Sequence, residues 1–155
     1  MPHPGAEHSA DAGPRAPVHP AEWPTLAVIA CGGVIGALAR HGLGVAFPQP
    51  PAAFPWTIFG INIAGCLLIG VLMAAIAEIR SAPGWLRPLL GVGVLGGFTT
   101  FSTYVLDIGR LLLAGAPHTA LLYLVATPVT AVAAAWTGDT VTRSLVRRGR
   151  RGRRP

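Results

Sequence analysis

Residues 96–104 read Gly96-Gly97-Phe98-Thr99-Thr100-Phe101-Ser102-Thr103-Tyr104, and they interrupt a segment that is otherwise apolar. Glycine and β-branched threonine both lower helix propensity, and Ser and Thr hydroxyls compete for backbone hydrogen bonds. Irregular backbone at membrane depth is tolerated only where protein buries it or where it lines a cavity. The stretch therefore predicts a transmembrane helix with a break, whose free carbonyl and N–H groups bind cations and anions respectively. A kinked packing helix is the alternative.

This stretch belongs to the third of four apolar segments, which span about 25–46, 56–79, 86–114 and 119–140. Each is near the roughly 20 residues that cross a bilayer core of about 30 Å. Only 12% of the residues are charged, against about 25% in an ordinary soluble domain. We therefore expect an all-α membrane protein whose channel domain covers residues 23–142. Residues 1–22 are predicted to be a disordered tail, and residues 143–155 an Arg-rich cytoplasmic tail.

The arginines predict the orientation of the chain. An even number of spans places both termini and the connection between the second and third spans on one side of the membrane. The two opposite loops hold no Lys or Arg. The predicted cytoplasmic side holds ten arginines: Arg15, Arg80, Arg87, Arg143, Arg147, Arg148, Arg150, Arg151, Arg153 and Arg154. The positive-inside rule then predicts a multi-pass protein of the cell membrane with both termini in the cytoplasm. The basic tail indicates contact with anionic lipid rather than nucleic acid.

Polar residues inside apolar spans are costly and mark candidate sites. Asn62, in the second span, either joins helices or donates its N–H groups to an anion in a pore. Arg40 shares a helix face with Gly32, Gly36 and Gly44, and it either extends to the interface or lines an aqueous entrance. In the fourth span, residues at i, i+4 and i+7 form either a polar track along a pore or hydroxyls bonded to the preceding turn: Tyr123, Thr127 and Thr130.

Three motifs together resemble the CrcB/Fluc family of fluoride channels, and the likeness extends from about residue 26 to residue 138. They are Gly32-Gly33-Val34-Ile35-Gly36-Ala37-Leu38-Ala39-Arg40, the stretch from Asn62 to Gly70, and residues 96–104. The resemblance implies a fluoride-selective channel, built as an antiparallel dimer, through which cytoplasmic fluoride leaves down its gradient. It also implies that the main-chain carbonyls of Gly96 and Thr99 bind a central Na⁺ that is structural and is not transported.

The resemblance further implies which residues form the pore: Asn62, Phe101, Tyr104, Ser102 and Thr103, with Arg40 near an entrance. Tyr104 departs from the family pattern, which has phenylalanine there. Its hydroxyl either adds a donor for the anion or misaligns the ring edge. Asp107 matches an acidic position that the family keeps, without a role that the sequence assigns.

Other classes of protein fit the sequence less well. A proton-coupled four-helix exporter needs a carboxylate deep in the membrane, whereas Glu78 and Asp139 lie at span ends and Asp107 lies off-centre. A non-transporting assembly subunit would leave the hydroxyl-rich break unexplained. The sequence shows no nucleophile–base pair or metal-ligand cluster, so an enzyme is not expected. Finally, the uneven arginines favour one orientation, and they predict that the antiparallel partner is a second family member of opposite topology.

Overall fold

The computed structural model describes residues 23–79 and 82–151, with side chains to residue 149. This part of the chain is all-helical, and four of its helical segments are long and apolar enough to cross a membrane. They are α1 (Trp23–Ala46), α2 (Trp56–Glu78), the broken span Arg87–Leu113, and α5 (Pro117–Arg151). The prediction of an all-α membrane protein with four spans is confirmed. The tail predicted over residues 1–22 lies outside the described residues, as do residues 80–81 and 152–155.

The third span is broken where the sequence predicts it. It consists of η2 (Arg87–Val94), α3 (Leu95–Phe98) and α4 (Ser102–Leu113), and residues 99–101, called the break from here on, are not helical. The first of these segments is a π-helix, whereas the sequence predicted an ordinary helix there. Gly91 and Gly93 lie within it, and glycine lowers the cost of leaving α-helical dihedral angles.

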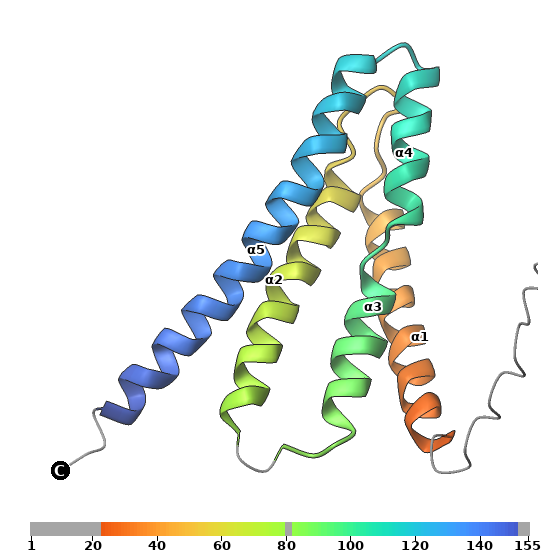
Figure 1. Cartoon of the computed structure of the whole chain (residues 1–155). Coiled ribbons are helices and arrows are strands. Elements are labelled where there is room, and N and C mark those ends of the chain that lie inside the picture. The colour runs from red at the N-terminus through yellow and green to blue at the C-terminus, as the bar shows by residue number, and fades with distance from the viewer. Residues whose placement is uncertain (1–22, 80–81, 152–155) are drawn as a thin grey trace, which may run out of the picture.

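The spans form two close pairs rather than a symmetric bundle (Figure 1). α2 lies along α5, while α1 lies along η2 and α3, and α4 reaches the upper part of α5. Glycines allow these pairs to approach closely. A Cβ atom on Gly70 would collide with the Ala135 carbonyl oxygen of α5, and one on Gly36 would collide with the Val94 carbonyl oxygen of η2.

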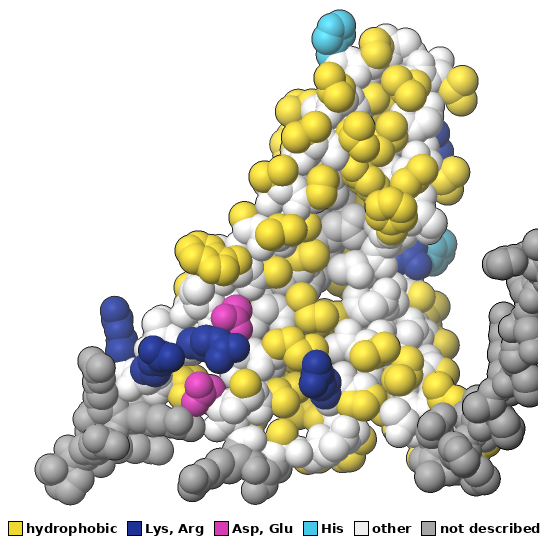
Figure 2. Space-filling view, viewed as in Figure 1, with side chains coloured by type: hydrophobic (Ala, Val, Ile, Leu, Met, Phe, Trp, Pro, Cys, Tyr) yellow, Lys and Arg dark blue, Asp and Glu magenta, His cyan; other side chains and the backbone are white. Residues whose placement is uncertain are grey.

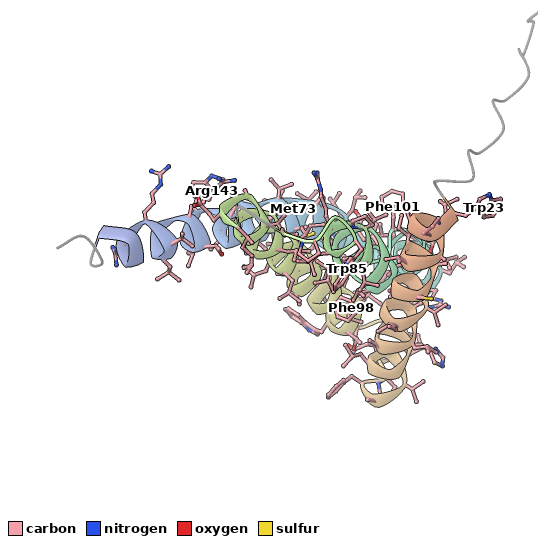
Figure 3. All side chains as sticks on the ribbon, turned by 90° about the horizontal axis from the view of Figure 1, so that it is seen from below. Trp23, Met73, Trp85, Phe98, Phe101 and Arg143 are labelled. Atoms are coloured by element: carbon pink, nitrogen blue, oxygen red, sulfur yellow. The ribbon has the colours of Figure 1, made fainter. Side chains whose placement is uncertain are left out.

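The ends of the helices divide into two groups. The start of α1, the connection after α2 and the end of α5 lie at one end of the molecule, and the loops 47–55 and 114–116 lie at the other (Figure 1). Seen from the first of these ends, Trp23 and Arg143 project away from the helices (Figure 3). α5 extends eleven residues beyond the segment that the sequence predicted, so the described part of the Arg-rich tail, residues 143–151, is helical.

Few side chains of this single chain are buried. The largest buried cluster joins α4 to α5 through Tyr104, Leu111, Ala120 and Tyr123. Large apolar side chains cover the outside instead (Figure 2), and Leu113 is 92% exposed. Such a surface would be unstable in water, whereas lipid or a second subunit would cover it.

Candidate functional site

The break exists because the sequence opposes a continuous helix there. Thr99 has extended backbone angles, φ −76° and ψ 158°, directly after the last helical residue of α3. Its backbone N–H and its hydroxyl both donate to the Leu95 carbonyl oxygen, each at 3.0 Å. The peptide groups that follow are left to find partners outside their own helix.

Asn62 supplies partners for the break from α2. Its Nδ2 donates to the carbonyl oxygen of Thr100 at 3.0 Å, and its Oδ1 accepts from the Thr100 N–H at 2.9 Å. The residue is 7% exposed. The amide therefore joins two spans, as one of the two sequence interpretations held. An amide nitrogen carries two N–H groups, so one of them remains for an anion, and that role stays a prediction.

Arg40 approaches the same segment from α1. Its Nε donates to the carbonyl oxygen of Gly97 at 3.2 Å, and the side chain is half-buried. The guanidinium therefore contacts α3, two residues before the break, instead of extending along α1 to the interface. This contact leaves the two terminal nitrogens of Arg40 without a hydrogen bond to the described residues.

Thr100 organises the start of α4, and the sequence did not single it out. Its Oγ1 accepts from the Thr103 N–H at 3.2 Å, donates to the Thr103 hydroxyl at 3.1 Å and lies 3.2 Å from the Ser102 hydroxyl. This is the pattern of an N-cap, in which a Ser or Thr side chain satisfies a free N–H of the first helical turn. The sequence signal for this cap is a threonine, Thr100, placed three residues before another hydroxyl-bearing residue, Thr103. Ser102 and Thr103 are thereby gathered at the positive end of α4.

The break opens on a groove of about 670 Å³. We call it the central groove, and its lining includes Asn62, Thr99, Thr100, Phe101, Tyr104 and Thr127. The structure thus brings together four of the pore and cation residues that the resemblance implied, with Thr127 of the predicted polar track opposite them.

The two aromatic residues after the break have different surroundings. Phe101 is 77% exposed, and its ring centre lies 5.7 Å from that of Tyr104. Tyr104 is 7% exposed, and its hydroxyl donates to the carbonyl oxygen of Leu124 in α5 at 2.7 Å. The Phe101 ring edge is therefore open to the groove, while the Tyr104 hydroxyl is engaged within the chain.

The predicted polar track is divided by the structure. Tyr123 is fully buried between the rings of Phe54 and Tyr104, with ring centres 5.2 Å away in each case. The Thr127 and Thr130 hydroxyls donate to carbonyl oxygens of the preceding turn at 2.9 and 2.6 Å. Only Thr127 lines the central groove, so the three residues do not form one continuous lining.

The carbonyls of Gly96 and Thr99 fit a cation by their chemistry. Neither accepts a hydrogen bond from any residue in the described part of the chain. Uncharged oxygens suit hard cations, and a Cβ atom on Gly96 would meet nothing within 4 Å, so that face is open. Residues 23–79 and 82–151 contain no cluster of His, Cys, Asp and Glu that could hold a metal ion. Two carbonyls are too few to enclose an ion, so further ligands must come from elsewhere.

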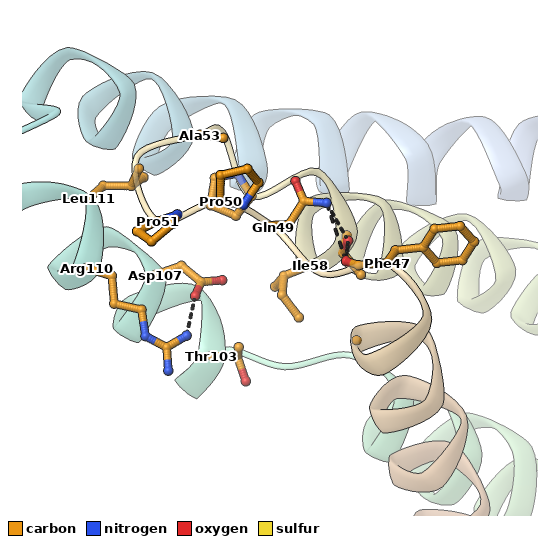
Figure 4. Close-up of a pocket in the computed structure, with 13 residues that line it drawn as sticks. Phe47, Gln49, Pro50, Pro51, Ala53, Ile58, Thr103, Asp107, Arg110 and Leu111 are labelled. Atoms are coloured by element: carbon orange, nitrogen blue, oxygen red, sulfur yellow. Dashed lines mark hydrogen bonds and ion pairs between the residues drawn. The ribbon is translucent and has the colours of Figure 1, made fainter. Parts of the chain in front are cut away.

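A second cavity of about 270 Å³ lies at the end of the molecule that holds the loop 47–55, opposite the start of α1 (Figure 4). Thr103, Asp107 and Arg110 of α4 line one side of it, and the loop 47–55 lines the other. Arg110 pairs with Asp107 at 3.1 Å. The other carboxylate oxygen of Asp107 is buried and has no hydrogen-bond partner among the described residues. Most of the residues that line this cavity are apolar, and among the predicted pore residues it contains only Thr103.

Comparison with known proteins agrees with this architecture. The family model described as "CrcB-like protein, Camphor Resistance (CrcB)" matches residues 27–139. The chain is 47% identical over 124 residues to "Fluoride-specific ion channel FluC 1" of Streptomyces coelicolor, which covers 80% of each protein. It is 46% identical over 132 residues to "Fluoride-specific ion channel FluC 2" of Streptomyces avermitilis, covering 82% of this chain and 84% of the relative. A relative from Thermobifida fusca, also named FluC 2, is 45% identical over 126 residues, which are 81% of this chain and 93% of the relative.

The matched region contains all of α1 to α4 except a few residues at the start of α1, and most of α5. It therefore includes the break, Asn62, Arg40 and the central groove. The chain belongs to the CrcB family of membrane proteins, whose similar members are named as fluoride-specific ion channels.

Proposed function

We propose that this chain forms a fluoride-selective channel of the cell membrane, through which cytoplasmic fluoride leaves down its electrochemical gradient. The observation that carries the proposal is the break itself, which lines the central groove and whose Thr100 peptide is bonded to Asn62. The relatives named as fluoride-specific ion channels support the choice of ion. They also agree with the expectation that the chain is not an enzyme.

Fluoride is strongly hydrated, so a selective pore must replace its water with hydrogen-bond donors. The donors available near the break are the second N–H of Asn62 and the hydroxyls of Ser102 and Thr103. The open ring edge of Phe101 adds a weakly positive surface. These groups would offset the cost of dehydration without fixing the anion in place.

A structural Na⁺ would be held by the free carbonyls of Gly96 and Thr99. The ion would supply a fixed positive charge that joins subunits at the centre of the assembly. Two carbonyls from each of two subunits would together give four oxygen ligands, which one chain alone lacks. Asp107 and Asp139 are each paired with an arginine of their own helix.

An antiparallel dimer would complete the site. In the single chain, the exposed Phe101 and the central groove lie on an uncovered surface. A second copy, or a second family member of opposite topology, would cover this surface and bring a second break beside the first.

The proposal is tested by measuring anion efflux from liposomes that contain the purified protein. The chain is reconstituted alone and after coexpression with a family member whose arginines have the opposite bias, and fluoride is compared with chloride. We expect rapid fluoride efflux and negligible chloride efflux from at least one preparation. Equal efflux of the two anions, or no fluoride efflux from either preparation of folded protein, would contradict the proposal.

A further inference from the structure

Pro128 lies inside α5, where a proline removes one backbone hydrogen bond. In a regular helix the N–H of residue 128 would donate to the carbonyl of Leu124, and proline has no N–H. A proline ring inside a helix also crowds the carbonyl four residues before it. Because lipid offers no water as a substitute, a freed carbonyl in a transmembrane helix needs a partner from a neighbouring element.

Tyr104 provides that partner from α4. Its hydroxyl donates to the Leu124 carbonyl oxygen at 2.7 Å, which is the length of a good O–H···O bond. Tyr104, Leu124 and Pro128 all line the central groove. The Tyr104 ring also lies between the rings of Phe101 and Tyr123, with ring centres 5.7 and 5.2 Å away, so the side chain is fixed at both its ring and its hydroxyl.

We propose that Tyr104 is a positioning residue coupled to Pro128. The Tyr104 hydroxyl replaces the hydrogen bond that the proline removes from α5. A hydroxyl donates one hydrogen, and here it goes to Leu124. The Tyr104 hydroxyl is therefore not a donor for the permeating anion, and it does not misalign the ring. It holds α5 against α4 and keeps the ring beside Phe101. A phenylalanine at position 104 would suffice only where residue 128 has an N–H.

The first test is a double-mutant cycle in folding stability with Tyr104→Phe and Pro128→Ala. Tyr104→Phe should lower the folding equilibrium constant roughly three- to tenfold in the natural background, the range of hydrogen bonds between membrane helices. In the Pro128→Ala background, where the substituted alanine restores the N–H, the same change at Tyr104 should have almost no effect. Equal losses in the two backgrounds would overturn the coupling. This readout does not require that the protein conducts fluoride.

Tyr123→Phe is the matched control for this cycle. Tyr123 is the neighbouring buried tyrosine, and its hydroxyl has no hydrogen-bond partner among the described residues. Its effect on stability should therefore be the same with Pro128 as with alanine at that position. A control that shows the same dependence on position 128 would attribute the coupling to general repacking and overturn the assignment to Tyr104.

The second test does not depend on how Pro128→Ala folds. The chain has two tyrosines, so Tyr104 is the only one left in the Tyr123→Phe variant. The Raman tyrosine doublet of this variant, in fluoride-free buffer, should show a phenol that acts as a strong hydrogen-bond donor. Adding fluoride should leave the doublet unchanged. A phenol that does not donate, or a doublet that shifts with fluoride, would overturn the proposal.

Discussion

The side-chain amide of Asn62 has one observed role and one proposed role. Its two hydrogen bonds to Thr100 hold a non-helical peptide at membrane depth, where an unpaired polar group is costly. The remaining N–H is the group proposed for fluoride. Holding the break and binding the anion are therefore linked through a single side chain, and a substitution that affects one function should affect the other.

This linkage predicts the effect of Asn62→Asp, which keeps the shape and the acceptor but removes both N–H groups. A carboxylate oxygen would face the Thr100 carbonyl oxygen in place of a donor, and the unpaired carbonyl should cost about 1–3 kcal/mol of unfolding free energy. A negative charge in an anion path should also abolish fluoride efflux. Thermal unfolding and liposome efflux of the same preparation measure both effects. A variant with natural stability and natural efflux would show that Asn62 serves neither role.

The site residues that the sequence predicted and those that it missed differ in a physical way. Asn62 and Arg40 were predicted because a polar group in an apolar span is visible in composition alone. Thr100 was missed, since its importance lies in contacts that only the folded chain shows, with Asn62 of α2 and with the first turn of α4. The hydrogen bond from Tyr104 to Leu124 was also missed, because the carbonyl of an apolar residue carries no signal unless the proline four residues later is considered.

At the scale of helices, small residues decide how close α1 comes to the third span. A Cβ atom added to Gly36 would lie 2.7 Å from the Phe98 backbone nitrogen and would also collide with the Val94 carbonyl oxygen. Backbone atoms cannot rotate away as the end of a side chain can. The contact on which Arg40 depends for its bond to Gly97 therefore requires glycine at position 36.

Gly36→Ala should consequently separate α1 from η2 and α3. We expect a loss of about 1–3 kcal/mol in unfolding free energy, the usual cost of overpacking. Gly42→Ala in the same helix is the matched control, because a Cβ atom there meets nothing within 4 Å. It should be neutral, or stabilising by up to about 1 kcal/mol, since alanine favours helix. Equal stabilities of the two variants, measured by thermal unfolding in the same detergent, would refute the close approach.

Most ends of the four spans lie within a few residues of the ends that the sequence predicted, because the length of an apolar segment follows the thickness of the bilayer. The sequence prediction missed the extension of α5 to Arg151, where the segment leaves the apolar range but arginine still favours helix. There Arg143 pairs with Asp139 at 2.8 Å, one turn apart. The π-helix of η2 was missed as well, since its residues have the same apolar character as an α-helical span.

For the whole assembly, the proposed Na⁺ predicts a dependence of dimer stability on this ion. A ligand that binds only the assembled state stabilises it by mass action, by about 2.7 kcal/mol at one hundred times its Kd. Thorough replacement of Na⁺ by a large organic cation should therefore lower the dimer midpoint and the fluoride efflux. Thr99→Ser, which keeps both the carbonyl and the hydroxyl, should matter much less. Dimer stability that is indifferent to Na⁺ would remove the ion from the proposal.

The distribution of arginine bears on how such a dimer can form. Arg87, Arg143, Arg147 and Arg148 all lie toward the end of the molecule where α1 begins and α5 ends, and Figure 2 shows basic side chains gathered there. Arg110 lies near the opposite end, and it is paired with Asp107 as Arg143 is with Asp139. Arg15, Arg80 and most of the tail arginines lie outside the residues whose side chains are described. The described arginines are thus distributed unevenly between the two ends of the molecule, as the sequence indicated.

Such inequality should drive the chain into the membrane in one orientation, with both termini in the cytoplasm. Two copies inserted the same way cannot form an antiparallel pair, so the working channel should be a heterodimer with a family member of opposite bias. Reporters of topology fused to the C-terminus should give an almost purely cytoplasmic signal, and an equal split between the two sides would contradict the single orientation. Fluoride efflux should then require coexpression of the partner. Full efflux from the chain expressed alone would instead mean that it inserts both ways despite its arginines, because helices that have already paired in one orientation do not turn over in the bilayer.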